Sequence, residues 1–137
     1  MRVLGVTARV ICHATEDEKK VLKALENVLG SIEKGKLKRE QLIGHYGDPI
    51  VLLTLELNDE DQAKAVLDKL EKCLSVIEKS TLVSEAFEEK GQESILYVRL
   101  DKQSAYLGSL RLSDSDAIKL EIRIAGSLNA LKDKLGV

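Results

Sequence analysis

The sequence predicts an α+β fold in which one largely antiparallel sheet of about five strands is packed with helices. Two observations predict it. Segments rich in β-branched and aliphatic residues alternate with segments of helical apolar spacing, in the order β-α-β-β-α-α-β-α-β-α. The second and third strands are separated by a glycine- and proline-containing turn, which indicates a hairpin. The chain has 137 residues, 44% of them hydrophobic, with no repeat or linker, so residues 1–137 are expected to form a single domain.

The first predicted elements are a strand and a helix. Val3–Cys12 is rich in β-branched and aliphatic residues, which favours a strand. Thr15 and Glu18 have the spacing of a capping box, which predicts that a helix begins at Thr15. Apolar residues at helical spacing follow, and Gly30 supplies the stop.

A hairpin is expected next. Residues 34–39 form a basic connector that leads into a strand at 41–46. Gly47-Asp48-Pro49 is a turn, and the strand Ile50–Leu57 completes the hairpin. The run Ile50–Leu53 is apolar without alternation, which predicts that this strand is covered on both faces near its start.

Two helices should follow the hairpin. Asn58 is expected to cap the first, with acidic residues in its first turn and an apolar face that extends to Leu74 and Ile77. Ser80–Glu89 has the apolar spacing of a further short helix, with Phe87 on its apolar side.

The last third of the chain predicts two strands and two helices. Ile95–Leu100 is a strand, and Asp101 caps a short helix that Gly108 ends. Alternation of apolar and charged residues from Ile118 to Ile124 indicates a strand with one buried and one wet face. Ser127 then opens the final helix.

Charge and cysteine content restrict the function classes. Twenty-one basic residues face 23 acidic ones, a net charge of −2, so nucleic-acid binding would depend on uneven placement of charge. Cys12 and Cys73 stand alone and without a CxxC motif, which favours reduced structural cysteines in the cytosol. The N-terminus resembles a strand and no apolar run is long enough to cross a bilayer, so we expect a soluble, cytoplasmic protein without membrane attachment.

Few residues could support catalysis. Cys12 next to His13 could form a nucleophilic pair, and Cys12, His13, His45 and Cys73 could converge on a metal, but no zinc-like spacing requires it. Acidic groups at predicted helix starts are explained by the helix dipole. We therefore expect neither an active site nor a metal or other cofactor.

Glycine motifs give little support for nucleotide binding. Neither a P-loop nor a dinucleotide-binding motif is present. Gly44-His45-Tyr46-Gly47 matches the GxxG with which KH domains clamp RNA, but strands rather than helices flank it. The glycines are better explained as the turn of the hairpin.

Basic residues give the one binding signal. Residues 34–39 hold four positive charges and no acid, and Lys119 and Arg123 share the wet face of the alternating strand. Such groups could bind phosphates, although a solvated surface also explains them. With three tyrosines and one phenylalanine in the chain, contact with phosphates and with RNA shape is expected rather than extensive base stacking.

Three motifs carry a resemblance to a known family. They are Cys12–Glu18, Gly44–Ile50 and Val98–Gly108, in this order. Together they resemble an archaeal family described as RNA-binding proteins and predicted exosome subunits, which is related in fold to the large-subunit ribosomal protein that binds 5S rRNA. The resemblance extends from Val3 to about Ile124.

The resemblance implies a curved, largely antiparallel sheet and a non-catalytic accessory role in RNA processing, decay or ribosome-related work. The expected partners are RNA, with structured or double-stranded RNA favoured, and exosome or ribosome-related proteins. The candidate RNA-contacting residues are His45, Tyr46, Arg99, Lys102, Gln103, Tyr106 and Arg111 from the motifs, and Lys34, Lys36, Lys38 and Arg39 from charge alone.

Two other functions remain open at this point. A protein–protein adaptor, or a homodimer, would show an exposed apolar patch and no contiguous positive field. An enzyme would need Cys12, His13 and His45 to converge in a pocket.

Overall fold

The computed structural model describes all 137 residues, and its centre is one six-stranded sheet in which every pair of neighbours is antiparallel. The strand order is β2-β3-β1-β6-β5-β4. The elements are β1 (Arg2–Cys12), α1 (Glu18–Leu29), β2 (Lys36–Ile43), β3 (Pro49–Leu57), α2 (Glu60–Cys73), α3 (Val76–Glu85), β4 (Phe87–Lys90), β5 (Glu93–Asp101), α4 (Lys102–Tyr106), β6 (Ala117–Ala125) and α5 (Leu128–Leu135). The predicted α+β class with a single antiparallel sheet is confirmed, with one strand more than expected.

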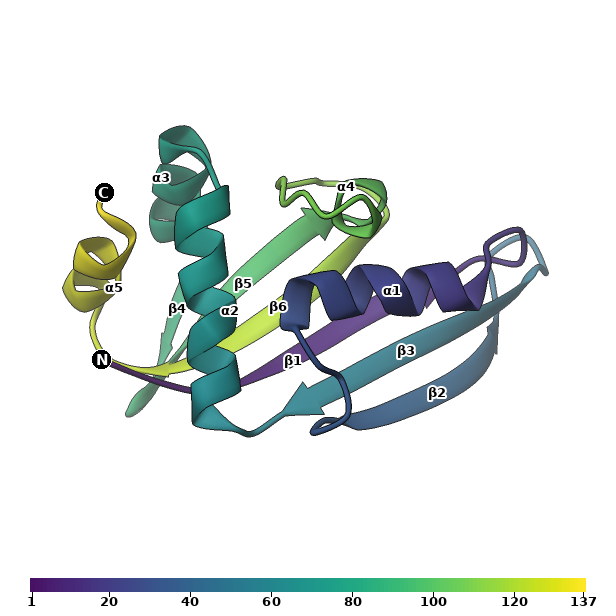
Figure 1. Ribbon diagram of the computed structural model, residues 1–137, viewed down its shortest axis with the longest axis horizontal. Helices are drawn as coiled ribbons and strands as arrows, with labels where there is room; N and C mark the ends of the chain where they lie inside the picture. Colours follow the sequence, from purple (N-terminus) through teal and green to yellow (C-terminus); the bar gives the residue numbers. More distant parts are fainter.

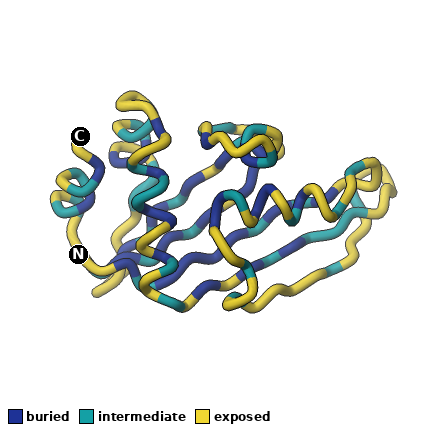
Figure 2. Tube along the Cα trace, in the orientation of Figure 1, coloured by how far each residue is buried: buried dark blue, intermediate teal, exposed yellow.

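The helices cover one face of the sheet. Figure 1 shows α1 and α2 crossing the same face, with α3 and α5 beside one another at the β4 end and α4 directly after β5. A single cluster of 31 buried hydrophobic residues lies between the helices and the sheet, and the buried segments in Figure 2 follow this layer. None of the helices is long and apolar enough to cross a membrane.

The opposite face of the sheet has no helix over it. In β1, Val6, Ala8 and Val10 are at most 2% exposed because they point toward the helices. Arg9 and Ile11 alternate with them, point the other way and are only half-buried. We refer to the side of the sheet that carries Arg9 and Ile11 as the open face.

The helix caps differ from two of the predictions. Asp17, not Thr15, caps α1, because its side chain accepts a hydrogen bond from the Lys19 backbone N–H at 2.9 Å. Asp59, not Asn58, caps α2. In both cases the residue nearest the first turn is an aspartate, whose carboxylate is a good acceptor for the free N–H groups.

The predicted connector at residues 34–39 is largely part of the sheet. Strand β2 begins at Lys36, and it pairs with β3 from Lys36↔Glu56 to Ile43↔Pro49. Its charged side chains are compatible with this position because β2 is an edge strand, where charge protects the free edge from pairing with other chains. The hairpin and the turn role of its glycines are confirmed, but the turn begins at Gly44 and β2 ends at Ile43, whereas the sequence predicted strand to residue 46.

Residue 50 onward is less covered than predicted. Ile50 and Leu52 lie on the open face and are partly exposed, because no second layer packs there. The expectation that this strand start is covered on both faces was therefore wrong.

The segment from Leu74 to Lys90 also differs from prediction. Helix α2 ends at Cys73, and Ser75 starts α3 through a capping box with Glu78, which leaves Ile77 79% exposed instead of on the buried face. Phe87 begins strand β4 and pairs with Leu96, where the sequence predicted helix. The edge of β5 provides hydrogen-bond partners for this short strand.

A candidate nucleic-acid interface on the open face

Cationic side chains of neighbouring strands form a row across the open face, perpendicular to the strands. The strand registers pair Lys38 with Thr54, Thr54 with Arg9, Arg9 with Lys119, and Lys119 with Arg99. Directly paired residues of antiparallel strands project to the same side, so these five side chains are neighbours on five adjacent strands. With strands about 4.8 Å apart, they span about 19 Å. We name Lys38, Arg9, Lys119 and Arg99 the cationic row.

Half of the cationic row has no acidic partner. Arg9 pairs with Glu121 at 2.8 Å and Lys38 with Glu40 at 3.2 Å, whereas Arg99 and Lys119 are exposed and form no ion pair. Like charges directly opposite one another destabilise a sheet. A bound anion would remove this repulsion.

Arg123 extends the positive surface along β6. Its guanidinium donates to Thr7 Oγ1 at 3.2 Å and to Asn58 Oδ1 at 2.7 Å, both neutral acceptors, so its charge is not compensated. The guanidinium lies across Gly5, where an added Cβ would collide with Arg123 Nη2 and stand 2.7 Å from the backbone oxygen of Leu57. Only glycine at position 5 leaves room for this arrangement.

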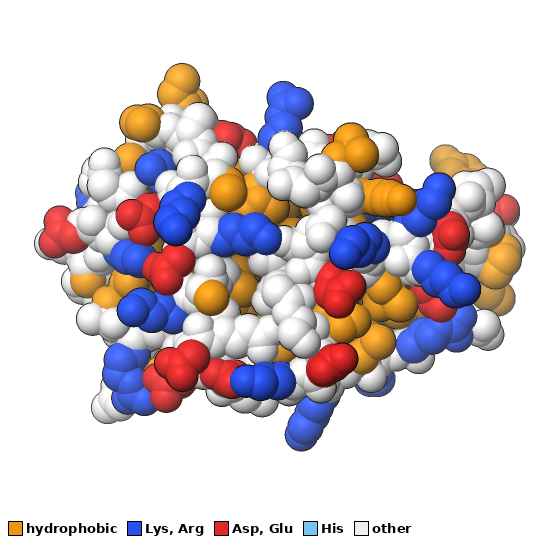
Figure 3. Space-filling view, in the orientation of Figure 1, with side chains coloured by type: hydrophobic (Ala, Val, Ile, Leu, Met, Phe, Trp, Pro, Cys, Tyr) orange, Lys and Arg blue, Asp and Glu red, His pale blue; other side chains and the backbone are white.

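The helix side of the molecule has a different charge distribution. In Figure 3, Lys and Arg side chains are interspersed with Asp and Glu over the helices. Several are paired, as in Arg39 with Glu18 at 2.6 Å and Lys34 with Asp59 at 3.5 Å. The open face differs in that its unpaired cations, Arg99 and Lys119, are fixed opposite one another by the strand register.

Strand alternation divides the predicted basic segment between the two sides of the sheet. Lys36 and Lys38 pair with Glu56 and Thr54 on the open face. Arg39 lies on the other face beside α1, where Glu18 neutralises it. The structure therefore places Lys36 and Lys38 on the same face as Arg99, at the other end of the cationic row, but not Lys34 or Arg39.

Of the remaining predicted residues, all but Arg111 lie away from the cationic row. His45 and Tyr46 occupy the β2–β3 turn, where their rings meet edge to face at 4.9 Å and Tyr46 is 88% exposed. Gln103 and Tyr106 lie on α4. The ammonium of Lys20 lies over the Tyr106 ring, 5.9 Å from its centre. Arg111 is exposed in the loop before β6, in a segment that pairs with the end of β5. Its carbonyl accepts from Asp101 N at 2.8 Å, which places Arg111 beside the Arg99 end of the cationic row.

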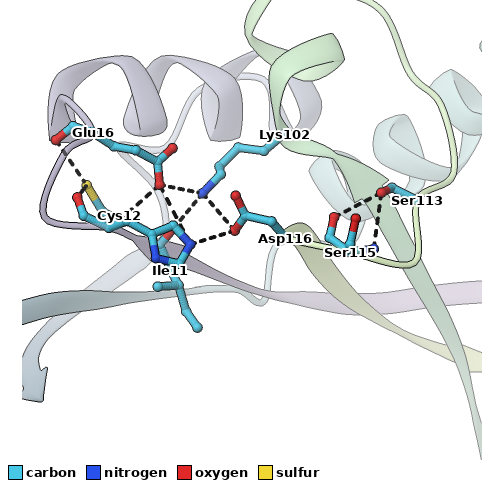
Figure 4. A network of polar contacts seen from close by, with 8 residues as sticks. Ile11, Cys12, Glu16, Lys102, Ser113, Ser115 and Asp116 are labelled. Carbon is cyan, nitrogen blue, oxygen red and sulfur yellow. Dashed lines mark hydrogen bonds and ion pairs between the residues drawn. The ribbon is translucent and has the colours of Figure 1, made fainter. Parts of the chain in front are cut away.

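Lys102 is buried, contrary to its predicted role as an RNA contact. It is 7% exposed, and its ammonium donates to Ile11 O at 2.7 Å, Glu16 Oε1 at 2.8 Å and Asp116 Oδ1 at 3.0 Å. Figure 4 shows these groups converging from the end of β1, the loop before α1 and the start of β6. The ammonium is fully engaged, so we assign Lys102 a structural role.

The residues around Lys102 include the one group of side chains in the chain whose ligand atoms are close enough to hold a metal ion. Ligand atoms of His13, Glu16 and Asp116 lie within 4.8 Å of one another, but the Lys102 ammonium already contacts both carboxylates. Burial raises the pKa of the Asp116 carboxyl, yet hydrogen bonds from His13 and Lys102 outweigh it and leave the pKa below its ordinary value. The cluster is thus an ionic clamp, in which one ammonium is held between two carboxylates.

The Cys12 thiol is not hydrogen-bonded to the ring of His13, the contact that a nucleophilic Cys–His pair would need. Cys12 is buried, and its thiol points to the backbone carbonyls of His13 and Glu16 at 3.8 and 3.7 Å. Burial, followed by the charge of Glu16, raises the pKa of the Cys12 thiol and disfavours the thiolate. Cys73 is exposed at the end of α2.

Sequence reasoning missed Arg9 and left Lys119 and Arg123 out of the candidate set. All three belong to strands that the sequence predicted correctly. Within Val3–Cys12, Thr7, Arg9 and Ile11 alternate with the buried residues, and this alternation was the signal that could have placed Arg9 on a wet face.

Comparisons with known proteins agree with one another. Residues 5–124 match a protein family described as RNA binding. A Pyrococcus abyssi protein named "RNA-binding protein" is 32% identical over 124 residues, 88% of this chain and 80% of that protein. An uncharacterized protein of Methanocaldococcus jannaschii is 30% identical over 117 residues, 83% of this chain and 78% of its own length.

Solved structures show the same fold. A DUF54 protein from Methanothermobacter thermautotrophicus superimposes with a TM-score of 0.81 at 24% identity, over 98% of this chain and 99% of the other. A DUF54 protein from Archaeoglobus fulgidus has a TM-score of 0.72 at 26% identity, over 96% of both chains. With the family match across most of the chain, these likenesses lead to one conclusion: the chain belongs to the RNA-binding family that includes these archaeal proteins.

Proposed function

We propose that the chain binds RNA through the open face of its sheet, with the cationic row in contact with phosphates. The observation that carries the proposal is the row itself, in which cations of four strands stand at one level although the chain as a whole has a net charge of −2. Membership of an RNA-binding family supports RNA as the polyanion.

The mode of contact follows from the composition of the open face. Tyr97, which pairs with Glu121, is the one aromatic residue on it. One ring offers little base stacking, so phosphate contacts dominate. The backbone ladder fixes the spacing of the cationic row, and a fixed row suits the regular backbone of a structured or double-stranded RNA.

The biological role that fits is that of a non-catalytic accessory protein. RNA processing, decay or ribosome-related work each use proteins that hold RNA without cleaving it. Kinship with the ribosomal 5S rRNA-binding protein, exosome or ribosome-related partners and a cytoplasmic location belong to this proposal.

A second function, as an adaptor for another protein, is favoured by one observation. Ile43 is 81% exposed and Tyr46 is 88% exposed at the end of the β2–β3 hairpin. Large exposed apolar side chains are typical of contact sites. They stand at one end of the molecule and do not interrupt the cationic row, so a protein partner and RNA could be bound together.

The test is RNA affinity across a salt series for an Arg99→Gln/Lys119→Gln double variant. Fluorescence anisotropy with a short labelled RNA duplex should give a salt slope lower by about 1–2 and an affinity lower by about tenfold or more at low salt. Removal of like charges that face one another should leave the melting temperature equal or higher.

The matched control is Lys23→Gln/Lys72→Gln, which removes two exposed lysines from α1 and α2 on the helix side. It changes net charge equally and should leave the slope near that of the unmodified protein. Equal loss in both variants would show that only total charge matters. Failure of the unmodified protein to bind RNA at low salt would refute direct recognition and favour the adaptor.

A further inference from the structure

A hollow of about 500 Å³ lies on the open face beside the cationic row. It is lined by Arg9, Val10, Ile11, His13, Leu52, Arg99, Asp116, Ala117 and Lys119. Its volume falls within the range of small-molecule sites in proteins, roughly 300–1,000 Å³. Three residues of the cationic row stand around it.

The floor of the hollow is apolar. Ile11 of β1 pairs directly with Leu52 of β3. On the open face this is the pair next to Arg9 and Thr54, two residues further along each strand. Ala117, which begins β6, adds a methyl group to the lining. Aliphatic side chains without a covering layer, next to unpaired cations, form a surface that is apolar in the centre and positive at one side.

The opposite rim carries hydrogen-bonding groups. His13 Nε2 lies 2.9 Å from Asp116 Oδ1, the oxygen that also accepts from Lys102. Asp116 Oδ2 accepts no hydrogen bond within the protein, and the Asp116 side chain is 51% exposed. One carboxylate oxygen is therefore available to accept from an N–H or O–H group of a ligand.

We propose that this hollow holds one unpaired nucleotide of the bound RNA. The base lies with one face on Ile11 and Leu52, the adjoining phosphate contacts Arg99 and Lys119, and Asp116 Oδ2 accepts from an amino group of the base or a hydroxyl of the ribose. The inference rests on the proposed function and narrows its substrate class to structured RNA with an overhang, bulge or other unpaired nucleotide.

The chemistry excludes a paired base from the same position. Inside a duplex both faces of a base are stacked and its pairing edge is occupied, so its apolar face cannot reach the floor. An unpaired base exposes both faces and the edge. The charge order of the hollow, cations at one side and a free carboxylate oxygen at the other, matches a nucleotide with its phosphate at one end and its donors at the other.

The experiment compares a blunt RNA duplex with the same duplex extended by one unpaired 3′ adenosine. The unmodified protein should bind the extended duplex about fivefold or more tightly, as expected when one face of a base is buried on aliphatic side chains. Leu52→Asn makes the floor polar without a change of charge, so it should abolish this preference and keep the affinity for the blunt duplex.

Ile50→Asn is the matched control. Ile50 lies on the open face of the same strand, two residues from Leu52, and does not line the hollow. Its variant should keep the preference for the extended duplex. Leu52→Thr, which retains a residue favourable to strands, repeats the test if Leu52→Asn lowers the melting temperature.

The outcomes separate the inference from the proposed function. Equal affinity of the unmodified protein for the two duplexes would overturn the nucleotide site and leave RNA binding intact. An unchanged preference in both Leu52 variants, or an equal loss in Ile50→Asn, would overturn the assignment to this hollow. Absence of binding to either duplex would overturn both proposals.

Discussion

Replacement of Lys102 by methionine removes the ammonium that joins three separate segments. The ammonium is hydrogen-bonded to Ile11 O, Glu16 Oε1 and Asp116 Oδ1. Methionine has a similar length and apolar stem, so packing of the stem is largely preserved. The variant therefore isolates the contribution of the charge.

The magnitude follows from the burial of the partners. Loss of one member of a buried ion pair costs about 3–5 kcal/mol when the other is left without solvent. Here Glu16 and Asp116 are 30% and 51% exposed, so water replaces part of the lost contact. We expect a loss of about 2 kcal/mol, or about 6 °C in melting temperature for a domain of this size.

The expected loss depends on pH through Asp116. Its pKa is lowered in the folded protein, so the associated stability is present above the unfolded pKa of about 3.9 and lost as pH falls through the folded value. The difference between the two proteins should be full at neutral pH and shrink in acid. Urea unfolding followed by circular dichroism, at neutral and at acidic pH, measures this difference in the free energy of unfolding.

Lys23→Met is the control, because Lys23 is exposed on α1 and forms no ion pair. It should unfold within about 0.5 kcal/mol of the unmodified protein. A Lys102→Met protein as stable as this control at neutral pH would refute the view that Lys102 is a clamp. Its burial would then have another cause.

Two further predictions concern the open face and the thiols. Glu121→Gln should remove the acidic partner of Arg9 and raise RNA affinity about two- to fivefold, with a salt slope higher by about 1, measured by anisotropy. The same change at Glu26, which is exposed on α1, should have no such effect. An unchanged salt slope in Glu121→Gln would argue against Arg9 as a phosphate contact. In a thiol-alkylation time course the exposed Cys73 should react first, and the buried Cys12, with its raised pKa, should react about 100-fold more slowly until the protein is unfolded. Equal native rates for the two cysteines would contradict the burial of Cys12.

Local sequence signals predicted the elements that carry them. The caps at Asp101 and Ser127 act within three residues, and both were located correctly. The alternation from Ile118 to Ile124 likewise gave β6 and its two faces. Strand β4 has no such signal, because it forms against a neighbour, with Phe87 opposite Leu96.

The candidate site depends on information that lies far apart in the chain. Arg9 joins the cationic row because β1 pairs with both β3 and β6, and no local pattern specifies those registers. Lys102 looks like a free cation until Glu16, 86 positions away, is placed beside it. The number of basic residues could be counted from the sequence. Which of them are engaged in the Lys102 cluster and which are exposed on the open face could not be predicted from it.

The position of β1 has a consequence for synthesis on the ribosome. Of the six strands, β1 is the first in chain order, and it lies in the interior of the sheet, between β3 and β6. Its partner β3 follows within 57 residues, whereas β6 is complete only at Ala125. Until then the nascent chain presents one bare edge of β1, a template for pairing with a wrong strand. Addition of β6, rather than formation of the β2–β3 hairpin, is therefore the step that covers this edge of β1 and joins it to β5. A chain truncated before Ala117 should aggregate.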